Sequence, residues 1–535
     1  MFHQLVTPVA NSLVASFTTA AIPIAVVLVL LGVLRRPAWQ ASIAGLAVAF
    51  ALATTVWQLP VGIALDSVAA GATFAAWPVM WIVVNALLLY NVTVASGRFD
   101  SFRDWMVEHL PNDRRVALII IGFSFGCLLE GVAGFGAPIA ITSALLISLG
   151  FRAIDAVVFT LIFNTAPVAF GALGSPVTTL GAVTQLHDVA LGAMIGRQLP
   201  LMALLLPFYV IAIYGGVRAI RGVWPILLVS GGSFALIQFI SSNYLGYALT
   251  DVLSSLSSLI LTIAFVKIWQ PAHDPQFALR DTGIEAVPHE RSAHPAWQGW
   301  MPWIVLSVVV IVWVHFEVNL IGQIKIEWPG LHNAVFITTY GKPYAAIWTF
   351  QPLATGTAIL VATTITAFAT RLSLANLAQA MKGTARQVRL PLVTTMIIVG
   401  LAYLMNYSGI AYTLGVGVAS VGFLFPLVSA FLGWLAVFLS GSDTSGNALF
   451  GNLQVVAANQ LGLSPILMAA TNASGGVMGK MVSPQNITTG TSTTSIKGQE
   501  GEVLARTFWH SIFLTLVLGV IVMLQQYVFP GVIPS

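Results

Sequence analysis

The amino-acid sequence predicts an all-α, polytopic integral membrane protein with about 12 to 14 transmembrane helices, some of them broken or folded into hairpins. Of its 535 residues, 57% are hydrophobic and only 7% are charged, namely 22 basic and 18 acidic side chains. Soluble domains carry about 25% charged residues. The apolar composition extends over the whole length, with a mean hydropathy of +0.90. Lipid is therefore the expected solvent for most of the chain, which excludes a soluble enzyme.

Apolar segments of the length that a bilayer requires follow one another along the chain. They lie near residues 17–34, 39–58, 73–96, 116–151, 154–184, 198–216, 223–242, 246–268, 299–316, 353–370, 389–407, 419–440, 446–494 and 507–529. The longest of these segments hold either one crossing or a broken pair, which accounts for the range in the predicted number.

Basic residues in the connections predict the orientation. They occur as Arg35 with Arg36, Arg98 to Arg115, Arg152, Arg218 with Arg221, Lys267 to Arg291, and Arg371 to Arg389. Cytoplasmic connections are enriched in Lys and Arg, and placing all of these inside puts both termini in the periplasm. The long polar connection, about 270–298, is expected to be a flexible cytoplasmic loop.

An internal repeat is the second organising feature. Ser96-Gly97 matches Ser408-Gly409 at an offset of 312 residues, and Ser175-Pro176 matches Ser483-Pro484 at an offset of 308. We expect one repeat at about 73–216 and the other at about 389–529, within a single transport domain that spans residues 1–535. Basic residues flank the early turns of the first copy and are missing from those of the second. This opposite sidedness indicates inverted-topology repeats and alternating access.

Two acidic residues lie inside otherwise uncharged segments. Glu130 lies in GFSFGCLLEGVAGFGAP, and Asp443 lies in SGSDTSGNALFGN. An ionised carboxylate at membrane depth costs about 2.5 to 3.5 kcal/mol on insertion scales unless it is paired, protonated or hydrated. Each is therefore a candidate for carrying a proton or facing a substrate, and the alternative is a structural carboxyl that bonds freed backbone amides at a helix break.

Two further motifs, NTAPVAFGALGSP at 164–176 and NASGGVMGKMVSPQNITTGTSTT at 472–494, combine Asn, Gly and Ser-Pro. These residues interrupt helices, and half-helix N-termini that point to the midplane bind anions. Lys480 lies within the second motif. It is expected to bind a substrate carboxylate or to neutralise Glu130 or Asp443, with snorkelling toward the membrane interface as the alternative.

Other function classes receive no support from the sequence. A single cysteine, Cys127, excludes an internal disulfide and a cysteine metal cluster. The dispersed basic residues form no stripe for nucleic acid. The chain has no Walker, HExxH or CxxC motif, so neither a metal nor a cofactor is expected and no enzymatic activity is predicted.

The segments EGVAGFGAPIAI, NTAPVAFGALGSP, SGSDTSGNALFGNLQ and ASGGVMGKMVSPQNI resemble signature segments of the bacterial lactate permease family. The resemblance extends over essentially the whole chain. It implies a multi-pass transporter of the bacterial inner membrane that imports L-lactate, D-lactate or glycolate together with protons. The implied partners are this small substrate, protons and the lipid bilayer.

The resemblance assigns roles to residues at the matching positions. Glu130 or Asp443 is expected to couple the proton, and the expected substrate-binding residues are Asn164, Ser175, Asn472, Lys480, Ser483 and Gln485. Three alternatives remain open at this point. They are a sodium-coupled carrier of organic anions, a proton-relaying membrane subunit of an energy-converting enzyme, and a channel.

Overall fold

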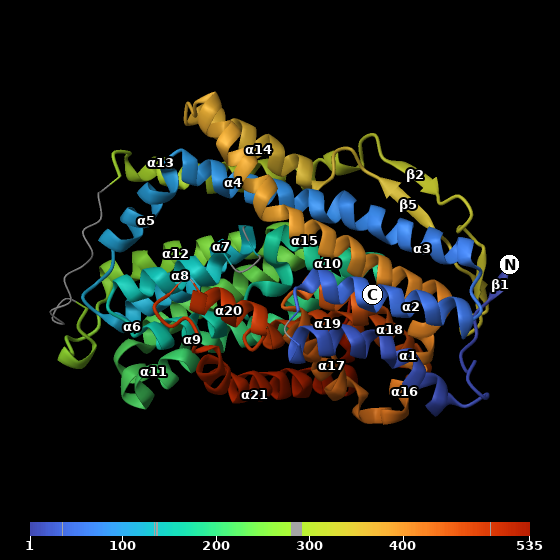
Figure 1. The fold of residues 1–535 in the computed structure, drawn as a ribbon. Coiled ribbons are helices and arrows are strands. Elements are labelled where there is room, and N and C mark those ends of the chain that lie inside the picture. The colour runs from blue at the N-terminus through green and yellow to red at the C-terminus, as the bar shows by residue number, and fades with distance from the viewer. Residues whose placement is uncertain (35, 133, 135–136, 280–291, 493, 535) are drawn as a thin grey trace.

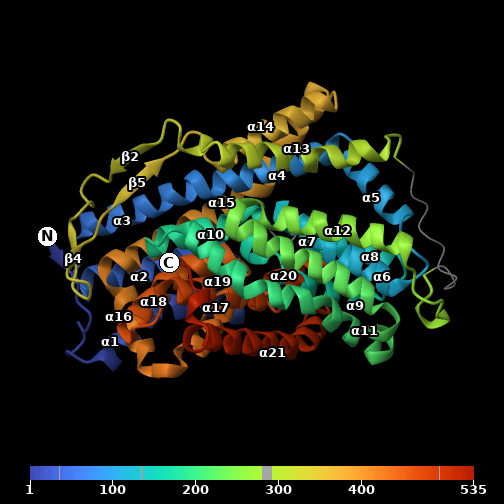
Figure 2. The same ribbon diagram turned by 180° about the vertical axis from the view of Figure 1, so that it is seen from behind.

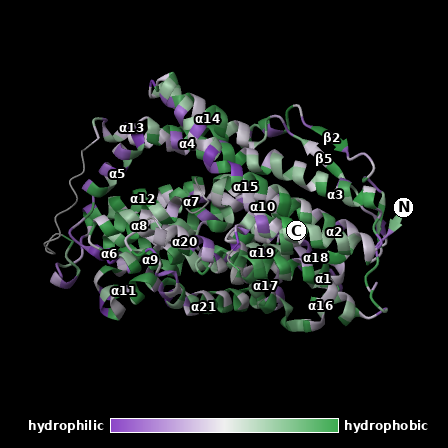
Figure 3. Ribbon diagram, in the orientation of Figure 1, coloured by the Kyte–Doolittle hydropathy of each residue, from purple (hydrophilic) through white to green (hydrophobic). Residues whose placement is uncertain are grey.

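Long, roughly parallel helices form the bulk of the molecule (Figure 1). The structure is a computed structural model, and it describes all residues except 35, 133, 135–136, 280–291, 493 and 535. Hydrophobic residues dominate the lengths of the long helices, and hydrophilic residues gather at their two ends (Figure 3). This distribution is the one that a bilayer around the middle of the bundle requires.

The helices of the first half are α1 (Leu13–Leu28), α2 (Ala38–Thr55), α3 (Val61–Phe74), α4 (Trp81–Ala95), α5 (Arg98–Glu108), α6 (Arg114–Ala117), α7 (Gly126–Val132), α8 (Ala137–Ser148), α9 (Ala153–Phe163), α10 (Gly171–Thr184), α11 (Asp188–Ile240) and α12 (Thr250–Ile268). Those of the second half are α13 (Ala296–His315), α14 (Thr355–Ala369), α15 (Leu374–Ser408), α16 (Ile410–Val418), α17 (Phe425–Ser440), α18 (Asp443–Leu461), α19 (Pro465–Lys480), α20 (Pro484–Ser492) and α21 (Glu500–Tyr527). Helix continues from α6 into α7, so that Arg114–Val132 forms one span.

Ten helical segments among the described residues are long and apolar enough to cross a membrane, and the bent pair α9–α10 makes eleven. The two helices of that pair meet at 64°. α11 counts once, although Gly215 and Gly216 leave the helical conformation and divide it in two. The structure is thus the all-α polytopic bundle that the sequence predicts. Counting α11 once, although it is broken at Gly215 and Gly216, accounts for part of the difference from about 12 to 14 crossings.

A small layer of strands covers one end of the bundle. β2 (Ile324–Glu327) pairs with β5 (Ile347–Phe350), and β3 (Val335–Ile337) lies between β1 (Phe2–His3) and β4 (Lys342–Pro343). The N-terminus therefore lies in this strand layer (Figure 1). The sequence predicts one long polar connection, at 270–298, and the strand layer is a second one. Its strands are short and carry no membrane-length pattern, so the sequence does not indicate it.

The opposite end of the bundle collects basic residues. Arg506, at the start of α21, pairs with Asp155 at 2.9 Å, and Arg218 pairs with Asp274 at 3.2 Å. The polar connection also begins and ends here, and the Ser292 hydroxyl lies 2.7 Å from that of Ser101 on α5. Residues 280–291 of this predicted loop lie outside the described residues. The strand layer and the basic end thus cap opposite ends of the bundle.

Helices of the two predicted repeats begin at equivalent glycines. α5 follows Gly97 (φ +71°), and α16 follows Gly409 (φ +98°). Both backbones are left-handed, a conformation that glycine adopts without a Cβ penalty. Gly97 lies against His294 at the basic end, whereas Gly409 lies against Leu5 beside the strand layer. Equivalent turns at opposite ends are what inverted repeats would produce.

Close approach of α17 and α19 holds the second half of the bundle together. A Cβ on Gly433 would collide with the backbone oxygen of Asn472, and one on Gly475 with that of Ala430. Small residues let two membrane helices approach until their backbones touch. This contact sets the position of Lys480, at the end of α19, relative to the end of α17.

We expect Gly433→Ala to destabilise the protein, because overpacking a dense helix contact costs about 1 to 3 kcal/mol. The midpoint of thermal unfolding in detergent should fall. Gly383→Ala is the matched control, because a Cβ there meets nothing within 4 Å and alanine favours the helix. Equal midpoints for the two variants would contradict the importance of this contact.

Candidate functional site

A buried ion pair joins the two halves of the chain. Lys480 Nζ lies 2.5 Å from Glu130 Oε1, and the residues are 5% and 3% exposed. Asn164, at the end of α9, donates to Glu130 Oε2 at 3.0 Å. Both carboxylate oxygens therefore have donors, which satisfies the condition under which a buried charge is tolerated. Of the two neutralising roles predicted for Lys480, the structure shows the pairing with Glu130.

Helix breaks bring these residues together. Ala172, Leu173 and Gly174 leave the helical conformation with φ of 44°, 54° and 81°, directly before Ser175. A positive φ at residues other than glycine costs energy and is held by the surrounding structure. In the second Ser-Pro motif, α19 ends at Lys480 and α20 begins at Pro484. Both predicted Ser-Pro breaks are thus present.

The break beside Glu130 is described only in part. α7 ends at Val132, α8 begins at Ala137, and Gly134 between them has φ +53°. The other residues of the predicted GVAGFG break, at 133 and 135–136, lie outside the described residues. The described part agrees with a helix interruption next to Glu130.

Asp443 occupies the matching place in the second half, at the break between α17 and α18. It is the first residue of α18, and its Oδ2 accepts from Asn447 at 3.2 Å, whereas its Oδ1 has no hydrogen-bond partner among the described residues. Gly476 on α19 leaves room for this carboxyl, because a Cβ there would collide with Oδ1. A carboxyl oxygen without a donor next to a cavity is available to a proton or a ligand.

A small cavity of about 50 Å³ lies between these breaks. Five predicted residues line it, namely Glu130, Ser175, Asp443, Lys480 and Gln485. Thr444 of the SGSDTSGN motif lines it as well, together with Asn486. Its apolar wall comes from Val168 and Ala172. The cavity thus offers one ammonium group, several hydroxyl and amide groups, and a short apolar surface.

Three predicted residues stand behind the cavity rather than in its wall. Asn164 bonds Glu130, as described above, and the Ser483 hydroxyl lies 3.0 Å from Asn486 Nδ2. Asn472 donates to the Asn447 side chain at 2.9 Å and is fully buried on α19. These residues are placed to orient the lining groups, which is a different role from the direct contact predicted for them.

Asp251 on α12 is a buried carboxyl that the sequence analysis missed. It is 1% exposed, and it interacts electrostatically with Glu130 and Lys480. The sequence could have identified Asp251 as a candidate, because it is an acidic residue within the apolar segment 246–268. The neighbouring Ser and Thr residues make that segment resemble an ordinary helix start, where an acidic residue is common, so Asp251 does not stand out as a candidate.

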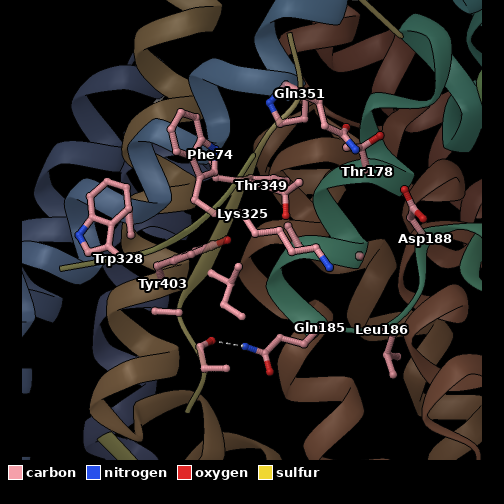
Figure 4. A pocket seen from close by; sticks show the side chains of 18 of the residues that line it. Phe74, Thr178, Gln185, Leu186, Asp188, Lys325, Trp328, Thr349, Gln351 and Tyr403 are labelled. Atoms are coloured by element: carbon pink, nitrogen blue, oxygen red, sulfur yellow. Dashed lines mark hydrogen bonds between the residues drawn. The ribbon is translucent and has the colours of Figure 1, made fainter. Parts of the chain in front are cut away.

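A larger cavity of about 630 Å³ lies beneath the strand layer. Figure 4 shows Thr178, Gln185 and Asp188 on one side of it and Lys325 and Thr349 of the strand layer on the other. Gln185 donates to the backbone of Ala345 at 3.2 Å across the cavity. We call this cavity the vestibule.

α10 connects the vestibule with the small cavity. Ser175 lines the small cavity, and Thr178, about one helical turn further along, lines the vestibule. Thr178 contacts the Tyr247 hydroxyl at 3.1 Å, and that hydroxyl donates to Asp188 at 2.6 Å. The left-handed residues before Ser175 thus lie close to the boundary between the two spaces. No cluster of side chains suited to a metal ion occurs within the described part of the chain.

Comparison with known proteins agrees with this description. A family model described as L-lactate permease matches residues 16–529. The L-lactate permease of Bacillus subtilis (strain 168) is 38% identical, with 99% of each chain covered. The glycolate permease of Escherichia coli (strain K12) is 39% identical over 97% of each chain, and an L-lactate permease of the same strain is 38% identical over the full length of both.

Members of this family are transporters and not enzymes, which confirms that no catalytic activity is to be expected and removes the energy-converting subunit as an alternative. The match covers both Ser-Pro motifs, both buried acidic motifs and strands β2 to β5 of the strand layer. The chain belongs to the L-lactate permease family.

Proposed function

We propose that this protein imports lactate and related 2-hydroxy monocarboxylates such as glycolate in symport with protons, by alternating access. Family membership supports a lactate or glycolate transporter. The observation that carries the coupling proposal is the Glu130–Lys480 pair in the wall of the small cavity. A proton on Glu130 would cancel its charge and free Lys480 for an anion.

The chemistry of the lining suits the proposed substrates. Lys480 supplies an ammonium group to the lining and would bind the substrate carboxylate. Ser175 and Gln485 offer partners for the 2-hydroxyl group, and Val168 with Ala172 would face the methyl group of lactate. Because glycolate lacks only that methyl group, the same contacts would hold it with a small loss of affinity.

Charge balance couples the two substrates. In the structure, Lys480 and Glu130 form a neutral pair. A lactate anion that displaced Glu130 from Lys480 would leave an unpaired buried carboxylate, which costs several kcal/mol. Protonation of Glu130 removes this cost, because the loaded site then holds neutral Glu130 and the Lys480–lactate pair. One proton accompanies one anion, and the transport cycle is electroneutral.

Asp443 is the second candidate for proton coupling. Its free oxygen Oδ1 and its place in the cavity lining support this role. Its Oδ2 accepts from Asn447, and Asn447 also accepts from Asn472, which ties Asp443 to the core of α19. We therefore propose that Glu130 is the carboxyl that the substrate displaces from Lys480. Asp443 then has a supporting role at the start of α18.

Alternating access rests on the two repeats, about 73–216 and 389–529. Equivalent turns lie at opposite ends of the bundle, as described for Gly97 and Gly409. Two inverted halves around one central cavity can exchange conformations, and each exchange would open the cavity to the other side. The vestibule supports access from the strand-layer side in the conformation described here.

For the orientation we propose a bacterial inner membrane with the basic end in the cytoplasm. The strand layer, the vestibule and the N-terminus would then face the periplasm. α21 starts at the basic end with Arg506 and crosses once, which would put the C-terminus on the periplasmic side as well.

Glu130→Gln should abolish lactate accumulation driven by a proton gradient and keep lactate exchange, because Lys480 is then permanently free. Uptake and exchange are measured in liposomes with sodium absent. Glu327→Gln is the control, because Glu327 is an exposed strand residue. Full accumulation in Glu130→Gln would exclude Glu130 from coupling, and wild-type uptake that requires sodium would favour the sodium-coupled alternative.

Lys480→Gln should unfold at lower temperature than the wild type, because it leaves Glu130 buried without its cation, at a cost of about 3 to 5 kcal/mol. The double variant Glu130→Gln with Lys480→Gln should recover much of this stability and still fail to bind lactate. Thermal unfolding with and without lactate measures both effects. Stabilisation of the double variant by lactate would show that Lys480 does not bind the substrate.

Gln185→Cys should react with a membrane-impermeant thiol reagent added outside intact cells, and the reaction should reduce lactate uptake by blocking the vestibule. Cys127 is 1% exposed and gives little background. Leu205→Cys, on the exposed apolar face of α11, is the control and should stay unlabelled in lipid. Labelling of Gln185→Cys from the cytoplasmic side alone would reverse the proposed orientation.

A further inference from the structure

We propose that Asp251 is a second proton-binding carboxyl, which receives the coupled proton from Glu130 and passes it along α12 toward the basic end of the molecule. This inference rests on the proton symport proposed above. It adds a proton acceptor and a route to that mechanism.

Asp251 lies against the segment that carries Glu130. It is the second residue of α12, which packs on α7. A Cβ added to Gly131, the residue after Glu130, would lie only 2.8 Å from the Cβ of Asp251. Glu130 and Lys480 are the charged groups that act on the Asp251 carboxyl, and Cys127 is a third titratable neighbour. Asp251 is thus within electrostatic range of the ion pair.

Neither oxygen of Asp251 has a hydrogen-bond partner within the described part of the chain. Glu130, in contrast, has a donor at each oxygen. An ionised carboxylate without any donor at this depth would cost several kcal/mol, so the conformation described here favours Asp251 as the neutral acid, with the proton bound. Asp251 also caps no backbone amide at the start of α12, so helix capping does not explain it.

A row of hydroxyl groups continues from Asp251 along one face of α12. Ser255, Ser258 and Thr262 follow at i+4, i+7 and i+11 and are fully buried. The Ser258 hydroxyl lies 2.8 Å from that of Ser124 and 3.1 Å from that of Ser230, whereas the Ser255 and Thr262 hydroxyls have no partner in the described structure. Hydroxyl groups both donate and accept, so such a row can pass protons.

This row runs in a definite direction. α12 begins near Tyr247, which contacts the vestibule residues Thr178 and Asp188, and it ends with Lys267 and Ile268. Figure 1 shows α12 extending toward the end of the molecule where α5 and α6 lie. The row therefore starts beside the central ion pair and leads toward the basic end.

The proposed step conserves charge. After the substrate leaves Lys480, the O–H bond of protonated Glu130 breaks, and the proton bonds to an oxygen of ionised Asp251. Glu130, now a carboxylate, pairs again with Lys480. The conformation described here corresponds to the state after this transfer, with Glu130 paired and the proton on Asp251. Release of that proton along the hydroxyl row resets the site.

Asp251→Asn tests this step, because the amide has the shape of the neutral acid and accepts no proton. Uptake driven by a proton gradient into liposomes should fall by about a hundredfold, the scale of a lost proton-transfer group. Lactate exchange at equal pH should persist, because exchange needs no proton release. The affinity for lactate in exchange should still depend on pH in Asp251→Asn and lose that dependence in Glu130→Gln.

Ser254→Ala is the matched control, because the Ser254 hydroxyl bonds Thr250 O of its own helix and lies off the row. Asp251→Ser serves as a second neutral variant should the Asn variant fail to fold. Wild-type uptake without proton movement would overturn the proposed function and this inference together. Proton-coupled wild-type uptake with an unchanged proton-to-lactate ratio in the Asp251 variants would overturn the inference alone.

Infrared difference spectra of the purified protein at neutral pH give a readout that does not depend on transport. The C=O stretching band of a protonated carboxyl should be present in the wild type and in Ser254→Ala and reduced in Asp251→Asn. A band of equal size in all three proteins would show that Asp251 is ionised and would overturn the proposal.

Discussion

The energetic cost of buried charge is the constraint on which the centre of this protein depends. A lone carboxylate or ammonium group at membrane depth is expensive, and Glu130 and Lys480 each reduce the cost of the other. Their pairing requires α7 and α19 to meet at their ends, although Glu130 and Lys480 are 350 residues apart in sequence. The helix breaks at Ala172–Gly174 and after Lys480 lie beside the small cavity at this meeting point.

The same constraint makes the pair suitable for transport. A permanent ion pair would only hold two helices together, whereas a pair beside a cavity can exchange one partner for a substrate ion. Protonation of one partner and binding of an anion to the other keep the site neutral only when the two occur together. Coupling between proton and anion then follows from electrostatics, without a requirement that the two ligands touch.

Close helix contacts provide the rigid frame that this exchange needs. Gly433 and Gly475 let α17 and α19 approach until their backbones touch, and Gly476 leaves room for Asp443. The strand layer, by contrast, covers the vestibule from outside and contributes Lys325 to its wall. Rigid helices thus position the charged groups, and the surface layer shapes the route by which an anion reaches them.

The sequence by itself determined the membrane class, the helix breaks, the family and the candidates Glu130, Asp443 and Lys480. Each of these follows from a local pattern, such as an apolar segment or a Ser-Pro motif. Tertiary structure decided that Lys480 bonds Glu130, that Asn472 lies behind the cavity, that Asp251 lies near the site without a donor among the described residues, and that the N-terminal strand β1 pairs with β3 from the middle of the chain. Such contacts depend on how distant segments pack in three dimensions, and no local pattern of residues encodes them.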